Sequence, residues 1–488
     1  MTALWIMLSL APAGAIACLL LKDSPWARHV VTGACAGAFA CSVWLTVLVE
    51  RDGPLHAANN WLQVDALSAL IALIVTSLGT LCAWYGGDYM IEVRRHDEND
   101  AHWAPGRYEA LYLGLLSCMI VSVASNNLGL LWVSVEGSTL SSALLVGYYR
   151  RPSAVEAGWK YLILSSVGIT LALLATVLLF YSSVHLFGEG GAGLQWTALR
   201  QVAAQLDPRF VRLAYLFALC GYGAKAGLAP MHSWLPDAYS QAPTPAAALM
   251  STALLSTSLT ALLRFHAITA GCVGAAWPGG LLTLFGIVSL VVALPFLLVQ
   301  GEYKRLLAYS SLEHTGIVTL AIGFGTPLAV FAGLLHLVVQ CFGKALAYLV
   351  GGSFLRATHS RRMDHWSGAL EASPALGVLL AGGGIALMGL PPAGTFLSEW
   401  FILMAGFSSP YHAIAIGALV ALVFAFIGLS YHWTRMLLGR PRAGFVDALP
   451  ARAQAPMFVM LAVVLVLGFA LPQPLRALLE HAAGVLRP

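Results

Sequence analysis

Apolar runs of about 20 residues follow one another along almost the whole chain. This is the length that an α-helix needs to cross the hydrocarbon core of a bilayer. Only 10% of the residues are charged and 59% are hydrophobic, whereas an average soluble domain carries about 25% charged residues. We therefore predict an integral membrane protein without a soluble domain of useful size.

The runs predict an all-α polytopic membrane protein with about 14 transmembrane helices. They are too long for the strands of a membrane barrel and do not alternate between polar and apolar residues. No basic residue precedes the first run, so we interpret it as a membrane helix rather than a cleaved signal. The candidate spans cover residues 3–21, 30–49, 65–88, 108–124, 126–148, 160–183, 210–230, 243–268, 277–299, 303–324, 326–350, 374–405, 411–434 and 455–473.

Lysine and arginine are distributed unevenly between the loops. Loops after odd-numbered spans hold about 17 of these cations, against about 7 on the other side. Because cytoplasmic loops are enriched in lysine and arginine, we predict that the odd loops are cytoplasmic and that both termini lie outside. The cations of the odd loops are Lys22, Arg28, Arg94, Arg95, Arg107, Arg150, Arg151, Lys160, Lys304, Arg305, Arg356, Arg361, Arg362, Arg435, Arg440, Arg442 and Arg452.

The positions of two interrupted helices suggest an internal repeat. The seventh span ends in Gly and Pro and then resumes, and the twelfth carries GLPPAG in its middle. We predict two inverted five-helix repeats, 108–268 and 277–434, with discontinuous helices 7 and 12. Residues 1–107 then form the first three helices, and 455–488 the last helix and a tail. Broken helices in matching positions of two halves indicate an ion pathway.

Ionisable side chains inside the spans are the candidate functional residues, because each costs at least about 2.5 kcal/mol in the bilayer centre. Glu136 lies near the middle of the fifth span and Lys225 in the seventh. Their opposite charges suggest a buried pair, either part of a proton pathway or a structural tie between two helices. An apolar pair would be as stable, which favours the pathway.

A polar stripe follows one face of the eleventh span. His336, Gln340 and Lys344 are four residues apart, so they share a helix face with steps of about 6 Å, which one water can bridge. Histidine is suited to a proton relay because its pKa lies near neutrality. Gln340 carries no proton but can hold a water. The pattern favours a relay over a single satisfied histidine.

Further ionisable residues lie beside the breaks and in the tenth span. Glu399 follows GLPPAG, where freed backbone groups require water, although a residue snorkelling from a helix end is the alternative. Glu313 and His314 add a titratable pair near mid-depth. We expect His232 and Asp237 in the connecting helix after the seventh break, near the outer or central water, either in the pathway or as local caps.

Several functions are disfavoured by what the sequence lacks. The 8 cysteines are scattered through apolar runs with no CxxC and no Cys/His metal spacing, so we predict no metal site. We find no phosphate-binding GxxxxGK[ST], no haem ligand pair and no nucleic-acid surface. We therefore expect no cofactor in this chain, and any redox chemistry in another subunit.

Four segments resemble the signature blocks of the antiporter-like subunits of respiratory complex I. They are KAGLAPMHSWLPDAYSQAPTPAAAL, YKRLLAYSSLEHTGIV, HLVVQCFGKALAYLVGG and GLPPAGTFLSEWFIL. The family also includes cation/proton antiporters and membrane-bound hydrogenases. The resemblance covers roughly spans three to thirteen. It implies 14 helices with two inverted five-helix repeats, which agrees with the pattern of spans.

The resemblance also assigns roles to residues by position. It implies that Glu136 is the glutamate of helix 5 and Lys225 its lysine partner on helix 7. His336 and Lys344 resemble the histidine and lysine of helix 11, and Glu399 the terminal carboxylate of helix 12. The implied proton pathway is a Glu-Lys-His-Lys-Glu axis, to which His314 adds a further titratable group.

The sequence departs from the family pattern at two positions. Ser256 stands about where the family has a lysine on helix 8, and Gln340 replaces a second histidine found in some members. A relay through Ser256 would need water, or His314 would take over. WVSVEGSTLSSALLVGYYRRPSAVEAGWKYLILSSVGI is most similar to the F subunit of hydrogenase-4-type complexes, which are group 4 [NiFe] hydrogenases.

The resemblance implies a proton-translocating subunit of a redox-driven complex of the hydrogenase-4, formate hydrogenlyase or complex I type. The chain is then a translocase component and not itself a redox catalyst. The implied partners are other integral membrane subunits, including further antiporter-like ones, a peripheral hydrogenase or quinone-reductase arm, and lipid, in a bacterial or archaeal plasma membrane. Alternatives are a Na⁺/H⁺ antiporter module, the membrane subunit of an inorganic-carbon uptake system, or a scaffold that does not pump.

Overall fold

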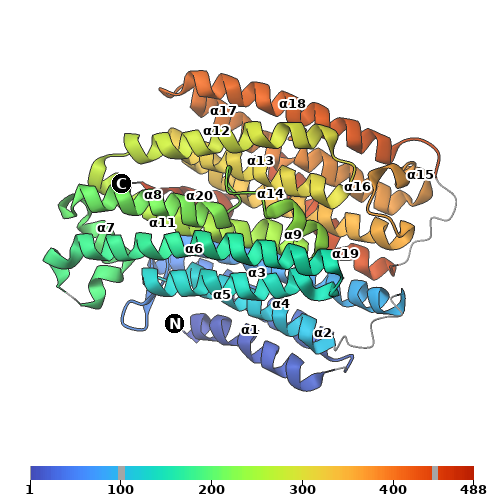
Figure 1. The fold of residues 1–488 in the computed structure, drawn as a ribbon, viewed down its shortest axis with the longest axis horizontal. Coiled ribbons are helices and arrows are strands. Elements are labelled where there is room, and N and C mark those ends of the chain that lie inside the picture. The colour runs from blue at the N-terminus through green and yellow to red at the C-terminus, as the bar shows by residue number, and fades with distance from the viewer. Residues whose placement is uncertain (1, 23, 97–104, 189, 442–448, 488) are drawn as a thin grey trace.

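Long helices run side by side through the computed structural model, which describes residues 2–22, 24–96, 105–188, 190–441 and 449–487. In Figure 1, α14 (Pro327–Thr358) lies in the middle of the bundle. Arg442, and the side chains of Arg94 and Arg95, belong to the cation count above but lie outside the described residues.

The helices follow one another with short connections. From the N-terminus they are α1 (Thr2–Leu21), α2 (Ala27–Asp52), α3 (Ala66–His96), α4 (Pro105–Ala124), α5 (Leu128–Val146), α6 (Pro152–Phe187), α7 (Trp196–Gln201), α8 (Pro208–Lys225), α9 (Leu235–Gln241), α10 (Thr244–Leu249) and α11 (Leu255–Val273). The second part holds α12 (Ala276–Val299), α13 (Tyr303–Phe324), α14, α15 (Ala369–Ala372), α16 (Pro374–Leu387), α17 (Gly394–Phe407), α18 (His412–Leu437), α19 (Ala455–Phe469) and α20 (Gln473–Leu486).

The nearly all-helical architecture confirms that the chain is an all-α protein. Within the described residues, 11 helices are long and apolar enough to cross a membrane, and α16 and α17 are shorter apolar helices. Two further helices occupy predicted spans but carry more charge: α8 holds Arg209, Arg212 and Lys225, and α13 holds Lys304, Arg305 and Glu313. Each predicted span thus coincides with a helix or a pair of helices.

The first break separates α8 from α9, as the Gly and Pro residues predict. Two side chains form hydrogen bonds with backbone groups at the interruption. The indole of Trp234 donates to the carbonyl oxygen of Ala224 at 2.9 Å, and the backbone N–H of Ala229 donates to Ser289 Oγ on α12 at 2.9 Å. The break is therefore a packed feature of the fold, stabilised from the neighbouring half of the chain.

The second break separates α16 from α17 at GLPPAG. Gly389 has a φ of +60°, which favours glycine. A Cβ atom at this position would stand 2.3 Å from Oε2 of Glu399. The backbone thus favours glycine here, and any larger residue would also push the Glu399 carboxylate out of its position.

The surface of the bundle is apolar where lipid would contact it. On α18, Ile416, Val420, Val423 and Ile427 recur at helical spacing, and each side chain is about half exposed. Inside, close helix packing depends on small residues. A Cβ atom on Gly286 of α12 would lie 2.6 Å from the backbone nitrogen of Leu320 on α13.

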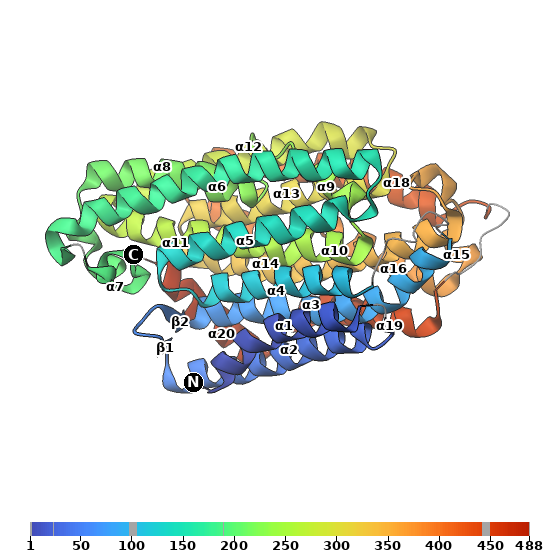
Figure 2. The same ribbon diagram turned by 60° about the horizontal axis from the view of Figure 1, so that its bottom comes forward.

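The hairpin, α7 and the end of α20, all outside the predicted spans, lie toward one end of the bundle. The strands β1 (Leu55–Ala57) and β2 (Leu62–Val64) pair as an antiparallel hairpin there, close to α7. The tail predicted after the last span forms the amphipathic helix α20, which buries Leu479 and Ala482. Figure 2 shows that the beginning of α1 and the end of α20 both lie toward this end, opposite α15.

Candidate functional site

Lys225 is completely buried at the end of α8, where the first break begins. Its ammonium group donates to the Oγ1 of Thr139 on α5 at 3.0 Å and also to the hydroxyl of Tyr161 on α6. The Tyr161 hydroxyl in turn lies 2.7 Å from Ser142 Oγ. The lysine is therefore held by neutral hydroxyl groups from two helices.

Glu136 lies on the same helix as Thr139 but does not contact Lys225 directly. One carboxylate oxygen accepts a hydrogen bond of 2.9 Å from Ser166 on α6, and the other oxygen is buried without a partner. Among the described residues, no carboxylate lies within ion-pairing distance of Lys225. Lys225 therefore does not pair directly with Glu136, as the opposite charges suggested. It bonds Thr139, which lies one helical turn from Glu136 on α5.

Lys344 is completely buried near the middle of α14. Its ammonium group donates to Ser310 Oγ on α13 at 3.1 Å. Glu313 follows Ser310 on the same face of α13, and one of its oxygens is buried without a hydrogen-bond partner. The second half thus repeats the first: a buried lysine is bonded to a hydroxyl, and a carboxylate lies one turn from that hydroxyl.

His314 and His336 form a direct link between α13 and α14. Nδ1 of His314 lies 3.0 Å from Nε2 of His336, and Nδ1 of His336 lies 2.9 Å from Ser398 Oγ on α17. Ser398 donates its single hydrogen to the carbonyl oxygen of Thr395 at 2.8 Å, so it accepts from His336. Neutral His336 therefore carries its proton on Nδ1, and its bare Nε2 accepts from His314.

Glu399 and Glu313 line one cavity of about 360 Å³ beside the second break. Its other walls are apolar and include Met388, Trp400 and Phe426. The cavity brings together α13, the break, α17 and α18. Two carboxylates therefore face a common space although 86 residues separate them in the chain (399 minus 313).

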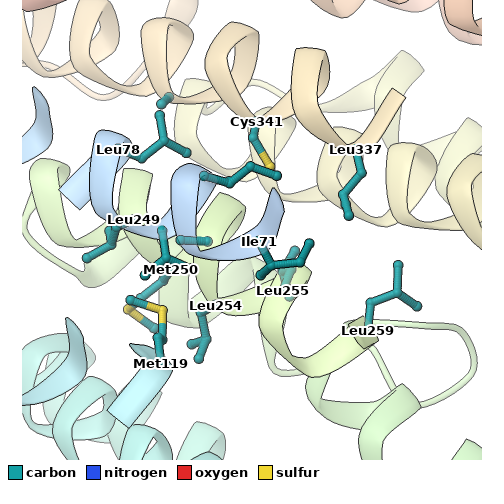
Figure 3. Packing of buried hydrophobic residues seen from close by; sticks show 14 of the residues in the cluster. Ile71, Leu78, Met119, Leu249, Met250, Leu254, Leu255, Leu259, Leu337 and Cys341 are labelled. Atoms are coloured by element: carbon teal, nitrogen blue, oxygen red, sulfur yellow. The ribbon is translucent and has the colours of Figure 1, made fainter. Parts of the chain in front are cut away.

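Ser256 on α11 meets α14 among mostly apolar side chains. Ser256 donates to the carbonyl oxygen of Thr252 at 2.8 Å, and its Oγ lies 3.2 Å from the Sγ of Cys341. Gln340 also donates to this sulfur, at 3.2 Å. Figure 3 shows the side chains around this point, among them Leu255, Leu337 and Ile71. Ser256 lies two residues after a short π-helical segment, Met250–Leu254, and such segments occur frequently at functional sites.

Asp237 pairs with two cations from neighbouring helices. Its carboxylate pairs with Arg305 on α13 at 2.7 Å and with Lys160 on α6 at 3.5 Å. Both cations belong to the loops after odd-numbered spans, so Asp237 lies on the side of the bundle that holds those loops. The predicted position of Asp237 relative to water stays a prediction. His232 is half-buried in the turn between α8 and α9, apart from the histidine pair.

Sequence reasoning missed the hydroxyl groups that hold the buried charges and one buried ion pair. Arg264 on α11 bonds both oxygens of Asp65, at 2.9 and 3.2 Å, and its guanidinium lies 4.4 Å from the ring centroid of Trp196. Arg264 lies in the apolar stretch LLRF, and a cation within a membrane span would have identified it as a candidate. The serines and threonines gave no comparable signal, because such residues commonly bond their own helix.

Residues 125–427 match the family described as NADH:quinone oxidoreductase/Mrp antiporter, TM. The chain belongs to this family. The match includes every predicted pathway residue from Glu136 to Glu399, and it confirms the resemblance drawn from the sequence blocks.

Two relatives and one solved structure extend the match. The chain is 36% identical to the hydrogenase-4 component F homolog of Methylacidiphilum infernorum (isolate V4) over 91% of each chain. It is 28% identical to hydrogenase-4 component B of Escherichia coli (strain K12), over 76% of this chain and 55% of that protein. A chain of the membrane-bound sulfane sulfur reductase, an archaeal respiratory membrane complex, has the same fold, with a TM-score of 0.88, 22% identity, and coverage of 100% and 98%.

Proposed function

We propose that this subunit translocates protons within a redox-driven membrane complex of the hydrogenase-4 or complex I type. One observation carries the proposal: Lys225 and Lys344 are both 0% exposed and are bonded to hydroxyl groups rather than to carboxylates. A buried ammonium without a direct counterion is costly. Such a group is retained in a membrane where it takes up and releases a proton.

The proposed pathway has two similar halves. In the first, protons pass between Glu136 and Lys225, with Thr139 and Tyr161 beside the lysine. In the second, Lys344, the histidine pair and Glu399 form the relay, and the cavity shared by Glu313 and Glu399 supplies space for water. The apolar packing around Ser256 favours two half-pathways that are coupled by charge rather than one continuous wire.

We propose the predicted architecture of 14 spans and two inverted repeats for the chain as it lies in the membrane. In support of it, the broken helices α8/α9 and α16/α17 occupy the same place in the two sets of five. Both termini lie toward the bundle end with α7, while α9, the helix that carries Asp237, lies nearer the other end. We propose that the second end faces the cytoplasm of a bacterium or archaeon, where a hydrogenase or quinone-reductase arm would bind.

The experiment compares the variants Lys225→Met and Lys160→Met in the assembled complex in sealed vesicles. Proton uptake, normalised to assembled complex, should fall at least tenfold with Lys225→Met. The control removes a lysine whose side chain is 51% exposed, and it should leave uptake unchanged. Unchanged pumping in both variants would support the scaffold alternative instead.

Cation antiport is the second candidate, because the family description includes Mrp antiporters. Measuring ²²Na⁺ flux beside proton flux in the same vesicles separates the two functions. If Lys225→Met abolishes sodium flux, and protons move only in exchange for sodium, the chain is an antiporter module. Bicarbonate uptake dependent on Lys225, without redox-driven proton flux, would favour the inorganic-carbon alternative.

A further inference from the structure

Three side chains that lie up to 85 positions apart in the sequence (399 minus 314) meet in a metal-binding geometry. His314, His336 and Glu399 each offer one ligand atom, and these atoms all lie within 4.8 Å of one another. No other group of three such side chains meets this condition in the part of the chain that the structure describes. Two imidazoles and one carboxylate are a ligand set typical of zinc sites with an open fourth position.

His336 is already held in the form that binds a metal. Its Nδ1–H is fixed by Ser398, which leaves the lone pair of Nε2 directed at His314. Histidines that bind metals almost always donate their other ring N–H to an oxygen in this way. His314 becomes a ligand through Nδ1 when its proton moves to Nε2, a change between neutral tautomers.

The spacing of the two imidazoles fits one ion. Zinc holds nitrogen ligands at about 2.0–2.1 Å, so two of them in tetrahedral geometry stand about 3.3 Å apart. The facing nitrogens of His314 and His336 are 3.0 Å apart. The ion therefore replaces the hydrogen bond when the nitrogens separate by a few tenths of an ångström and both rings turn so that their lone pairs converge on it.

Charge and chemistry select the class of ion. Glu399 and Glu313 supply two carboxylates to the same cavity. Their negative charges balance a divalent ion and reduce its repulsion by the nearby Lys344. Imidazole is a good ligand for Zn²⁺, Cu²⁺ and Ni²⁺, whereas Mg²⁺ and Ca²⁺ prefer oxygen. The cavity leaves room for water as the fourth ligand.

We propose that His314, His336 and Glu399 form a binding site for Zn²⁺ or a similar divalent transition metal. Binding replaces the hydrogen bond between the two histidines and occupies Glu399, so it stops proton transfer through the second half. This inhibitory effect rests on the proposed function, whereas the binding itself does not.

The test uses the full chain in detergent micelles, freed of metal by chelation, and titrates Zn²⁺ by calorimetry. We expect one site per chain in the wild type. The variants His336→Gln and Glu399→Gln should each weaken binding at least tenfold. The control His266→Gln changes another buried histidine, which lies 3.1 Å from the Tyr215 hydroxyl, and should bind zinc like the wild type. Thermal unfolding of each variant identifies any that fail to fold.

A second measurement separates this inference from the proposed function. Zinc should inhibit redox-driven proton uptake in vesicles reversibly, with recovery on addition of a chelator, and His266→Gln should be inhibited like the wild type. If folded His336→Gln and Glu399→Gln bind zinc as tightly as the wild type, the metal site is overturned, while the Lys225→Met result still stands. If the metal binds but Lys225→Met pumps normally, the site survives and the proposed function fails.

Discussion

The ammonium group of Lys225 is bonded to the hydroxyl of Thr139 at 3.0 Å, one helical turn from Glu136. Thr139 thus contacts Lys225 in place of Glu136, the partner that the sequence suggested. A hydroxyl can accept from a protonated lysine and, by rotation, donate to a neutral one. This makes Thr139 suited to a lysine that changes its protonation state.

Replacing Thr139 by valine should slow proton uptake several-fold without preventing assembly. Valine has the same shape but cannot accept the hydrogen bond, and a hydrogen bond to a buried charge is worth about 1.5–3 kcal/mol. The control is Thr257→Val, since Thr257 is buried but bonds only Ala253 of its own helix. Equal pumping rates in the two variants would remove Thr139 from the pathway.

Replacing Ser398 by alanine should weaken zinc binding about 10- to 100-fold, because outer partners orient metal-bound histidines. The ligands themselves remain in place, so the change reports the orientation of His336. Calorimetry of the full chain measures the affinity. Ser311→Ala is the matched control, since Ser311 is buried on α13 and bonds the carbonyl of Leu307. Unchanged affinity in Ser398→Ala would contradict the role of the His336–Ser398 bond.

Removing Arg264 should destabilise the protein strongly. Its side chain and that of Asp65 are only 3% and 2% exposed, and breaking a buried ion pair costs about 3–5 kcal/mol. We expect Arg264→Met to lower the midpoint of thermal unfolding in detergent. The double variant Asp65→Leu with Arg264→Met should lower the unfolding midpoint by less than the sum of the decreases in the two single variants. Additive losses would show that the two residues act independently.

Changing Gly286 to alanine should separate α12 from α13. Its Cβ would meet the backbone of Leu320 at 2.6 Å, and overpacking of this kind typically costs about 1–3 kcal/mol. The yield of assembled protein and the unfolding midpoint measure the effect. At Gly417 the nearest atom to an added Cβ is 4.0 Å away, so Gly417→Ala should be tolerated. A stable Gly286→Ala variant would mean that the helices adjust at little cost.

Replacing Ser256 by alanine should leave proton uptake within about twofold of the wild type, because its hydrogen is already committed to Thr252 within the same helix. The measurement is vesicle pumping normalised to assembled complex, with Lys225→Met as the inactive reference. A loss as large as that of Lys225→Met would show that the relay passes through Ser256.

Much of the candidate site could be predicted because charge is rare inside membrane spans. Lys225, Lys344 and Glu399 stood out for that reason, and each lies where its span was predicted. Which of these residues contact one another could not be predicted as well. Glu136 and Lys225 have opposite charges, yet the rotation of α5 and α8 places Thr139 and Tyr161 against the lysine instead.

The sequence by itself determined that this protein is a multi-span helical bundle, where two of its helices break, and which family it belongs to. Apolar length, Gly-Pro breaks and long signature blocks are local properties that survive without knowledge of packing. Only the tertiary structure decided which side chains meet. The His314–His336–Glu399 cluster combines residues from three helices, and no spacing along one chain segment reveals it, because helix rotation and crossing set such contacts.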